Sequence, residues 1–135
     1  MHTVGVFANI FDPEGRILCV KRNYGPRNWT TPGGRLEKGE SPLAALEREV
    51  LEETGYRIAP QQLVGIYANV YKDDVVISIC ACIVGQEEWS PNGEIAEIGF
   101  FSQDRLPEPM SANTLTRIRD AFAGKSGVVR AFESV

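Results

Sequence analysis

The stretch that decides the predicted fold is GGRLEKGESPLAALEREVLEETGY, residues 33–56. It opens on two glycines, and a run rich in Leu, Ala and Glu then predicts a helix over about residues 42–54. Ser41 is the predicted N-cap of this helix, Pro42 takes its first position, and Gly55 is suited to end it. The sequence therefore predicts a glycine-rich loop that runs directly into a short helix.

Acidic side chains gather on one side of this helix. At about 100° of rotation per residue, Glu49, Glu52 and Glu53 fall within an arc of about 100°. The arc lies beside an apolar stripe that contains Val50. Arg48 is the only base on the helix, so pairing between turns cannot neutralise the cluster. Two interpretations remain open on spacing alone: the face is solvated, or it binds Mg²⁺ or Mn²⁺, which prefer carboxylate and carbonyl oxygens.

Length and charge narrow the classes of protein that the chain can represent. A length of 135 residues predicts a single domain over residues 1–135. Of the formal charge of −4, residues 34–56 supply −3 through six acids and three bases. This local acidity argues against a nucleic-acid duplex as partner, because phosphate binding normally needs a basic face. No apolar run approaches the roughly 20 residues of a membrane span, so we expect no membrane partner.

The three cysteines, Cys19, Cys80 and Cys82, lie in apolar runs that are predicted to be strands. Side chains two residues apart on a strand are poorly placed for a disulfide, and the only histidine is His2, so a metal site here is disfavoured. We expect small, buried free thiols, which suit a reducing cytoplasm. No signal peptide precedes Thr3, so the expected location is cytoplasmic.

Strand and helix patterns alternate along the chain. The turn signal at residues 12–15 predicts a hairpin between the first two strands, and Pro60 is expected to end an extended segment. A second helix is expected from Ser111 or Asn113 to about Ala123. The arrangement predicts an α/β fold with one mixed sheet and helices on both faces. The predicted strands are residues 3–11, 16–22, 29–32, 56–58, 63–71, 75–84 and 95–102.

The spacing of the fixed positions in the acidic stretch is specific. They are Gly34, Glu40 after five residues, Arg48-Glu49-Val50 after seven more, and then Glu52-Glu53 and Gly55-Tyr56, each after one. This pattern resembles the Nudix box, the signature of the Nudix (MutT-like) hydrolases. Its one departure is Tyr56, where the family usually has a bulky aliphatic residue. The resemblance, together with the flanking strands, implies a Nudix-type α/β/α sandwich with a mixed β-sheet flanked by helices.

The resemblance also implies roles for the motif residues. Nudix enzymes use a divalent metal to hydrolyse nucleoside diphosphates that are linked to another group. Glu49, Glu52 and Glu53 are then metal ligands, with the carbonyl of Gly33 as a further ligand. Glu52 and Glu53 are expected to be catalytic. Arg48 is expected to contribute to catalysis by orienting a carboxylate of the cluster.

Many Nudix enzymes recruit one more carboxylate from a distant loop. The candidates here are Glu87, Glu88, Glu94 and Glu97. Glu94 best resembles the family position by its distance before the strand predicted at residues 95–102. We therefore expect Glu94 to be both a metal ligand and a candidate general base, with Glu97 as the alternative and Glu52 or Glu53 also open for the base.

Substrate contacts are less sharply indicated. Lys21 and Arg22 end a predicted strand near the expected pocket, where they are suited either to hold phosphates or to remain exposed. Arg27 and Trp29 are candidate substrate-binding residues that form a wall of the pocket, with core packing equally open for Trp29. Tyr67 and Trp89 are further candidates for stacking on a base.

The leading hypothesis is a Mg²⁺-dependent Nudix pyrophosphohydrolase, with Mn²⁺ as an alternative ion. It would cleave the diphosphate linkage of a nucleoside triphosphate or a nucleoside diphosphate derivative, so its partner is a small-molecule nucleotide. The alternative is a non-catalytic Nudix-fold regulatory module that binds a nucleotide. A Nudix-fold isomerase is disfavoured because that group usually needs a longer chain and a catalytic cysteine, whereas Cys19, Cys80 and Cys82 are all expected to be buried. The apolar tail at residues 128–132 is a candidate homodimer interface.

Overall fold

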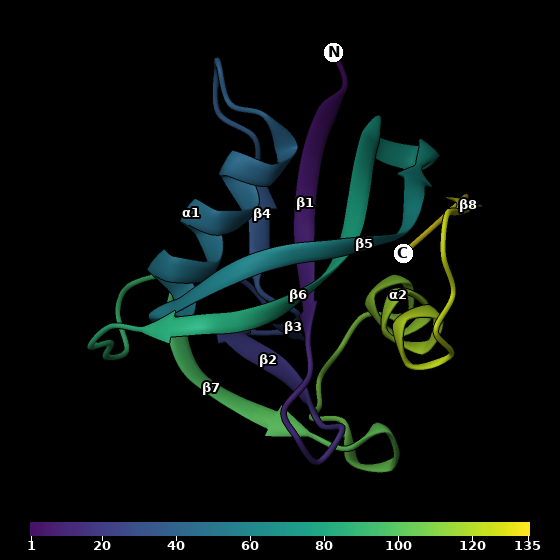
Figure 1. The fold of residues 1–135 in the computed structure, drawn as a ribbon. Helices are drawn as coiled ribbons and strands as arrows, with labels where there is room; N and C mark the ends of the chain where they lie inside the picture. The colour runs from purple at the N-terminus through teal and green to yellow at the C-terminus, as the bar shows by residue number, and fades with distance from the viewer.

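The computed structural model describes residues 1–135 as two helices, two short 3₁₀ turns and eight strands (Figure 1). The helices are α1 (Pro42–Thr54) and α2 (Ala112–Phe122), and the 3₁₀ turns are η1 (Val70–Lys72) and η2 (Gln103–Arg105). The strands are β1 (Thr3–Ile10), β2 (Ile17–Arg22), β3 (Trp29–Thr30), β4 (Gly33–Arg35), β5 (Tyr56–Asn69), β6 (Asp74–Gln86), β7 (Ile95–Phe101) and β8 (Val128–Phe132). Neither helix has the length and apolar character needed to cross a membrane.

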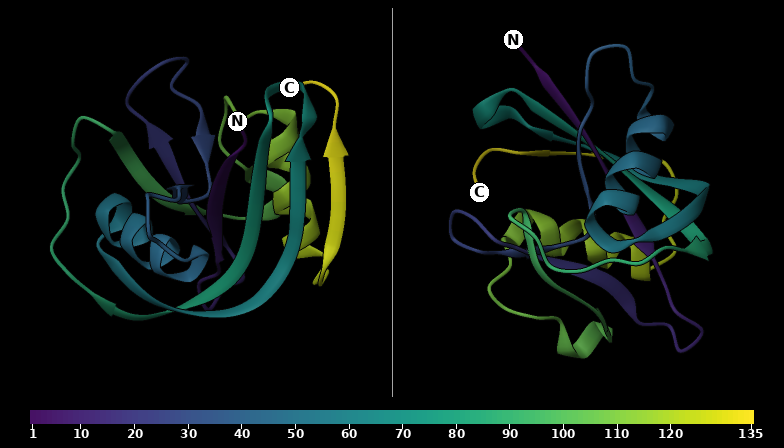
Figure 2. Two further views of the ribbon diagram at one scale, coloured as in Figure 1. Left: turned by 90° about the horizontal axis from the view of Figure 1, so that it is seen from above. Right: turned by 90° about the vertical axis from the view of Figure 1, so that its left-hand side faces the viewer.

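The strands form two sheets rather than the single mixed sheet that the sequence predicted. A five-stranded mixed sheet has the order β4-β1-β6-β5-β8, with β1 parallel to β6 and β5 parallel to β8. A three-stranded antiparallel sheet has the order β3-β2-β7. Helices α1 and α2 lie on opposite sides of β1 (Figures 1 and 2), which gives the expected α/β sandwich.

The prediction of a hairpin between the first two strands is wrong. β1 and β2 share only the bridge between Phe11 and Ile17, after which each strand pairs with other partners. The turn itself forms, with Asp12 accepting hydrogen bonds from the backbone N–H groups of Glu14 and Arg16, both at 2.9 Å. A turn signal shows where the chain reverses but not how far the strands stay paired. Both strands also carry apolar residues on both faces, which allows each to enter a different sheet.

Helix α1 begins and ends where the sequence predicts. The Ser41 hydroxyl accepts a hydrogen bond from the Ala44 N–H at 3.2 Å. Pro42 occupies the first turn, where a backbone N–H would have no partner within the helix, so its lack of an N–H costs nothing. Gly55 ends the helix with φ at 77°, a conformation that glycine adopts freely, and its N–H donates to the Leu51 carbonyl at 2.9 Å. These caps fix the length of the helix that carries the acidic cluster.

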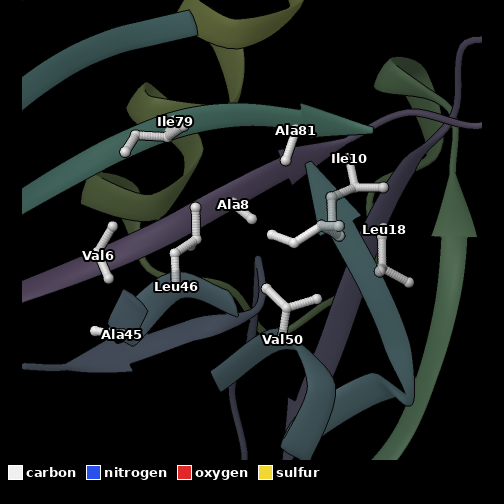
Figure 3. Packing of buried hydrophobic residues seen from close by; sticks show 10 residues of the cluster. Val6, Ala8, Ile10, Leu18, Ala45, Leu46, Val50, Ile79 and Ala81 are labelled. Atoms are coloured by element: carbon white, nitrogen blue, oxygen red, sulfur yellow. The ribbon is translucent and has the colours of Figure 1, made fainter. Parts of the chain in front are cut away.

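Helix α1 packs against both sheets through one apolar cluster (Figure 3). Leu46 and Val50 are fully buried and contact this cluster from the helix. Val6 and Ile79 join it from the five-stranded sheet, and Leu18 joins it from the three-stranded sheet. The apolar stripe of α1 is therefore fixed in the core, and the glutamates beside that stripe are held in a defined direction.

Helix α2 packs on the three-stranded sheet through a second cluster. Ile118 of α2 packs there with Ile17, Cys19 and Trp29. Successive side chains of a strand point to opposite faces, so Leu18 contacts the α1 cluster while its two neighbours contact the α2 cluster. The three-stranded sheet thus separates the two helices.

Two further expectations are corrected by the structure. Pro60 does not end an extended segment, because β5 continues through it with a register shift between Pro60 and Gln62. Such a bulge accommodates a residue that has no N–H to donate. Cys80 and Cys82 are half-buried rather than buried, although all three cysteines are free as expected.

A buried carboxylate ties the tail of the chain to the fold. Asp120 of α2 is 4% exposed and accepts a hydrogen bond from the Tyr67 hydroxyl of β5 at 2.7 Å. It also accepts from Nε and Nη2 of Arg130 in β8, at 2.7 and 2.8 Å. The hydrogen bonds from Arg130 are the main reason that the pKa of Asp120 lies below its ordinary value. Val129 of the same strand is 77% exposed, and a dimer interface at this tail stays a prediction.

Replacing Asp120 with asparagine is expected to lower the free energy of unfolding by about 1–3 kcal/mol at pH 7, because the charged acceptor for Arg130 is lost. The pKa of Asp120 is lower in the folded than in the unfolded chain, so this stabilisation is present above about pH 4 and declines as the pH falls through the folded-state value. Thermal unfolding at pH 7 and pH 3 should therefore show a smaller Tm difference between wild type and variant at pH 3. The exposed Glu133→Gln is the control, and a Tm difference of equal size at both pH values would contradict the assignment.

Candidate active site

A cavity of about 850 Å³ lies between the glycine-rich loop, α1 and α2. Three glutamates line it, Glu49 and Glu53 from α1 and Glu94 from the loop before β7. Gly33 and Gly34 of β4 line the same wall. The structure therefore brings the predicted loop, the predicted helix and the predicted distant carboxylate to one place.

Glu53 is buried and fixed by the loop. Its side chain, in a residue that is 5% exposed, accepts a hydrogen bond from the Gly33 N–H at 2.9 Å. Gly33 pairs with Phe7 of β1, and a Cβ on Gly33 would overlap the Val6 carbonyl, so this approach of β4 to β1 requires glycine. Burial raises the pKa of Glu53 to about 8, and the nearby charge of Glu49 adds to the rise. The surroundings of Glu53 therefore disfavour its charged form.

Glu49 packs directly on the second glycine of the loop. A Cβ on Gly34 would lie 2.6 Å from the carboxyl carbon of Glu49, so glycine leaves the room that this carboxylate occupies. Burial raises the pKa of Glu49, and the charges of Glu52 and Glu94 raise it further against the lowering effect of Arg48. Burial therefore disfavours the charged form of both Glu49 and Glu53, although their hydrogen-bond partners differ.

Glu94 reaches the cavity from an exposed loop. The Asn92 side chain accepts hydrogen bonds from the N–H groups of Glu94 and Ile95, at 2.8 and 2.9 Å, and so shapes the chain just before β7. The carbonyl of Glu94 accepts from the Asn23 N–H at 2.7 Å. Glu97, the alternative, lies on β7 opposite Lys21 of β2 and does not line the cavity.

Glu52 is placed differently from its two neighbours. Its side chain is 54% exposed, does not line the cavity, and lies 3.4 Å from Nη1 of Arg48. Its backbone carbonyl accepts a hydrogen bond from the indole N–H of Trp89 at 3.1 Å. The structure therefore groups Glu49, Glu53 and Glu94, and leaves Glu52 at the outer edge of the cluster.

Arg48 connects the loop to the acidic helix. Its Nε donates to Glu40 at 2.6 Å, its Nη2 donates to the same carboxylate at 2.9 Å, and its Nη1 donates to Glu49 at 2.8 Å. The hydrogen bond to Glu40 is the main reason that the pKa of Arg48 is raised, and it holds the pKa of Glu40 at about 2. Arg48 thus contacts Glu49 directly, and its orienting role in catalysis stays a prediction.

Of the four predicted substrate residues, the structure brings only Arg22 into the cavity wall. Lys21 pairs across strands with Trp29 and does not line the cavity, and Arg27 is exposed and donates to Asn23 at 3.0 Å. Trp29 is 6% exposed and packs edge-on against Phe101 with ring centroids 5.2 Å apart. The packing role for Trp29, left open by the sequence, is the one that the structure shows.

Comparison with known proteins assigns the family. A family model described as the NUDIX domain matches residues 1–121. The chain belongs to the Nudix family. A Bacillus subtilis (strain 168) protein, whose name provisionally assigns it 8-oxo-dGTP diphosphatase activity, is 35% identical over 128 residues, which cover 95% of this chain and 85% of that protein. An ADP-ribose pyrophosphatase of Methanocaldococcus jannaschii is 31% identical over 132 residues, covering 94% of this chain and 78% of the relative.

Solved structures agree with this assignment. The crystal structure of an ADP-ribose pyrophosphatase from Streptococcus suis 89-1591 matches this Nudix chain with a TM-score of 0.77 and 28% sequence identity. The match covers 98% of this chain and 100% of the other. The chain is therefore a Nudix hydrolase with the Nudix α/β/α architecture, as its sequence motif implied.

Nudix hydrolases generally use a divalent metal, and the donor groups in this cavity suit one. No three His, Cys, Asp or Glu side chains converge closely enough in this structure to form a ready metal site. The donor chemistry nevertheless fits Mg²⁺, because Glu49, Glu53 and Glu94 supply hard carboxylate oxygen atoms to the lining of one cavity. Burial raises the pKa of both Glu49 and Glu53, and charges of nearby glutamates add to each rise, a condition that a bound cation would relieve.

Sequence reasoning missed several polar residues on the far wall of the cavity. Asn69, Asp74, Asn113 and Arg117 all line it, and none belongs to the Nudix box. One signal was available, since Asn113 and Arg117 are four residues apart and so share a face of the second predicted helix. Asn113 and Arg117 are buried in the structure. Their spacing alone does not indicate burial, because polar residues four apart on a helix usually mark an exposed face.

Proposed function

We propose that this Nudix hydrolase is a Mg²⁺-dependent pyrophosphohydrolase, which cleaves the diphosphate linkage of a nucleoside triphosphate or a nucleoside diphosphate derivative. The observation that carries the proposal is that Glu49, Glu53 and Glu94 all line one cavity, which Gly33 and Gly34 line as well. Relatives named for small nucleotide substrates support it. The substrate is small enough for a cavity of about 850 Å³.

Each acidic residue has a distinct part in this proposal. Glu49, Glu53 and Glu94 would hold the metal together with the Gly33 carbonyl, and Glu52, at the outer edge of the helix, is the remaining proposed ligand. A bound Mg²⁺ would neutralise diphosphate oxygens and lower the pKa of a water molecule, and Mn²⁺ would supply the same chemistry. Glu53 is fixed by the Gly33 N–H and Glu49 by Arg48, so neither needs to be ordered when substrate binds.

Proton transfer falls to Glu94 in this scheme. Glu94 is exposed on its loop, whereas Glu53 is buried and already accepts a hydrogen bond. A carboxylate that solvent can reach is able to take a proton from the attacking water and pass it on. Glu97 faces Lys21 across the β2–β7 ladder and is not proposed for this step.

Basic residues around the cavity would bind the substrate's phosphates. Arg22, Arg35 and Lys72 all line it and are partly or fully exposed. Their charges attract a polyanion and counter the repulsion that it meets from the glutamates.

The three free thiols support a cytoplasmic setting, because a reducing compartment keeps cysteines unpaired.

A substrate panel with and without Mg²⁺ tests the proposal. Nucleoside triphosphates, ADP-ribose and other nucleoside diphosphate derivatives are incubated with the enzyme, and released phosphate and pyrophosphate are measured. We expect turnover of at least one of them that requires the metal and stops when EDTA is added. Tight nucleotide binding without turnover on the whole panel would instead favour a non-catalytic regulatory module.

A further inference from the structure

The loop that carries Glu94 into the cavity has little packing of its own. It comprises residues 87–94, between β6 and β7, and every residue in it except Trp89 is exposed. Its first contact is at the end of α1, where the Glu87 N–H donates to the Gly55 carbonyl at 2.7 Å. Exposed segments with few buried contacts are the least stable parts of a fold. The placement of Glu94 therefore depends on hydrogen bonds at the far end of the loop.

Two asparagines from different parts of the chain make those hydrogen bonds. Asn23, in the connection between β2 and β3, donates from its backbone N–H to the Glu94 carbonyl at 2.7 Å and from its Nδ2 to the Asn92 carbonyl at 2.8 Å. The side-chain oxygen of Asn92 accepts in turn from the N–H groups of Glu94 and Ile95, at 2.8 and 2.9 Å. Asn92 thus shapes the backbone around Glu94, and Asn23 attaches Asn92 to the end of β2.

Arg27 sets the orientation of the Asn23 amide. Its Nη2 donates to the Asn23 Oδ1 at 3.0 Å, so the amide oxygen is directed to Arg27 and the Nδ2 to the Asn92 carbonyl. A guanidinium can only donate and a carbonyl can only accept, so this position needs a side chain that does both. An amide does, whereas a carboxylate of the same size would keep the contact with Arg27 and lose the one with Asn92.

Asn23 is not itself part of the cavity wall. Its neighbours Arg22 and Tyr24 line the cavity, as does Glu94, but Asn23 does not. An effect of its side chain on catalysis would therefore be transmitted through the loop that it holds. Such an effect can be large, because a displacement of about 1 Å in a group that must be aligned for reaction costs roughly 100-fold in rate.

We propose that Asn23 is a positioning residue for the reaction, whose side-chain amide anchors Asn92 and thereby fixes the carboxylate of Glu94 in the cavity. This proposal rests on the proposed function, in which Glu94 takes a proton from the attacking water and helps to hold the metal. Asn23 contacts neither the substrate nor the metal. It adds to the site a residue that lies outside both the Nudix box and the cavity lining.

Asn23→Asp and Asn23→Ala test the anchor, because both remove the Nδ2 donor and only the first keeps an acceptor for Arg27. On the best substrate of the panel, each should lower kcat by about 10- to 100-fold and leave KM within about twofold. A wild-type kcat in Asn23→Asp would show that the contact with Asn92 is dispensable and would overturn the inference. The matched control is Gln103→Ala, an exposed amide of η2 outside the cavity lining, which should leave kcat unchanged.

A double-variant cycle shows whether Asn23 acts through Glu94. Glu94→Gln removes the carboxylate that is to be positioned, so adding Asn23→Ala to it should lower kcat by no more than about a further twofold. A purely structural role for Asn23 would give its full loss in both backgrounds, which would contradict the proposal. A wild-type kcat in Glu94→Gln would also overturn it, while metal-dependent turnover by the wild type would leave the proposed function standing.

Amide hydrogen exchange on the metal-free protein tests the anchor without any measurement of activity. The N–H groups of Glu94 and Ile95, which both donate to the Asn92 side chain, should exchange at least about threefold faster in Asn23→Ala, and those of α1 should exchange as in wild type. Equal exchange at Glu94 and Ile95 in wild type and variant would overturn the inference. Absence of hydrolysis by wild type in Mg²⁺ would instead refute the proposed function, and faster exchange in the variant would still establish the anchor.

Discussion

Replacing Glu53 with glutamine is expected to lower kcat by about 100- to 1,000-fold, the scale on which a single fixed electrostatic group contributes to such sites. Glutamine keeps the size of the side chain and an oxygen that can accept the Gly33 N–H. It removes the negative charge that the metal would need. Steady-state kinetics at saturating Mg²⁺, on the best substrate of the panel, measure the loss.

Glu47→Gln is the matched control for this variant. Glu47 is exposed on the same helix and does not line the cavity, so its replacement should leave kcat within about twofold, as surface changes usually do. Unfolding in EDTA should show a Tm for Glu53→Gln equal to or above that of wild type, because a buried carboxylate beside like charges has been removed. A kcat for Glu53→Gln that matches the control would contradict the assignment of Glu53.

Replacing Gly34 with alanine should also reduce kcat, by about 100-fold, because small displacements of a catalytic group cost roughly this much. The added Cβ would lie 2.6 Å from the carboxyl carbon of Glu49, so the carboxylate must move away from the position that Arg48 fixes. Steady-state kinetics with increasing Mg²⁺ should also show a higher metal concentration at half-maximal rate.

The control for the loop variant is Gly85→Ala. Gly85 is a glycine of β6, away from the cavity lining, and a Cβ there would meet Arg57 at an ordinary 3.5 Å. Its kcat should be unchanged, and thermal unfolding of both variants shows whether either loses its fold. A kcat for Gly34→Ala equal to wild type would show that the Glu49 carboxylate can shift without consequence.

The local part of the site is predictable from sequence because short-range rules determine it. Ser41 and Gly55 cap α1 as their chemistry dictates, and the apolar stripe that contains Val50 then fixes which way the helix faces. Glu49 and Glu53 follow from that orientation. The position of the Glu52 side chain does not follow, because it lies 3.4 Å from Arg48 at the outer edge of the cluster. Helix spacing alone does not determine that contact.

The far wall of the cavity depends on contacts between distant parts of the chain. Arg117 meets Phe7 only because α2 packs beside β1, and residues 110 positions apart carry no local signal of that contact. The same limit explains Trp29, whose position before the glycine loop was compatible with the cavity and with the core until α2 was placed. The hairpin error has a similar origin, because strand partners are selected by the whole sheet rather than by the turn.

The two tryptophans of this chain lie in different surroundings. Trp29, on β3, is buried against Ile118 of α2, whereas the indole of Trp89 donates to the Glu52 carbonyl in the last turn of α1. Intrinsic fluorescence therefore has one reporter in the hydrophobic core and one attached to the helix that bears the acidic cluster. Removing either tryptophan by substitution with phenylalanine would leave a single emitter, so global unfolding and local events at the catalytic helix can be followed as separate optical signals in the same enzyme.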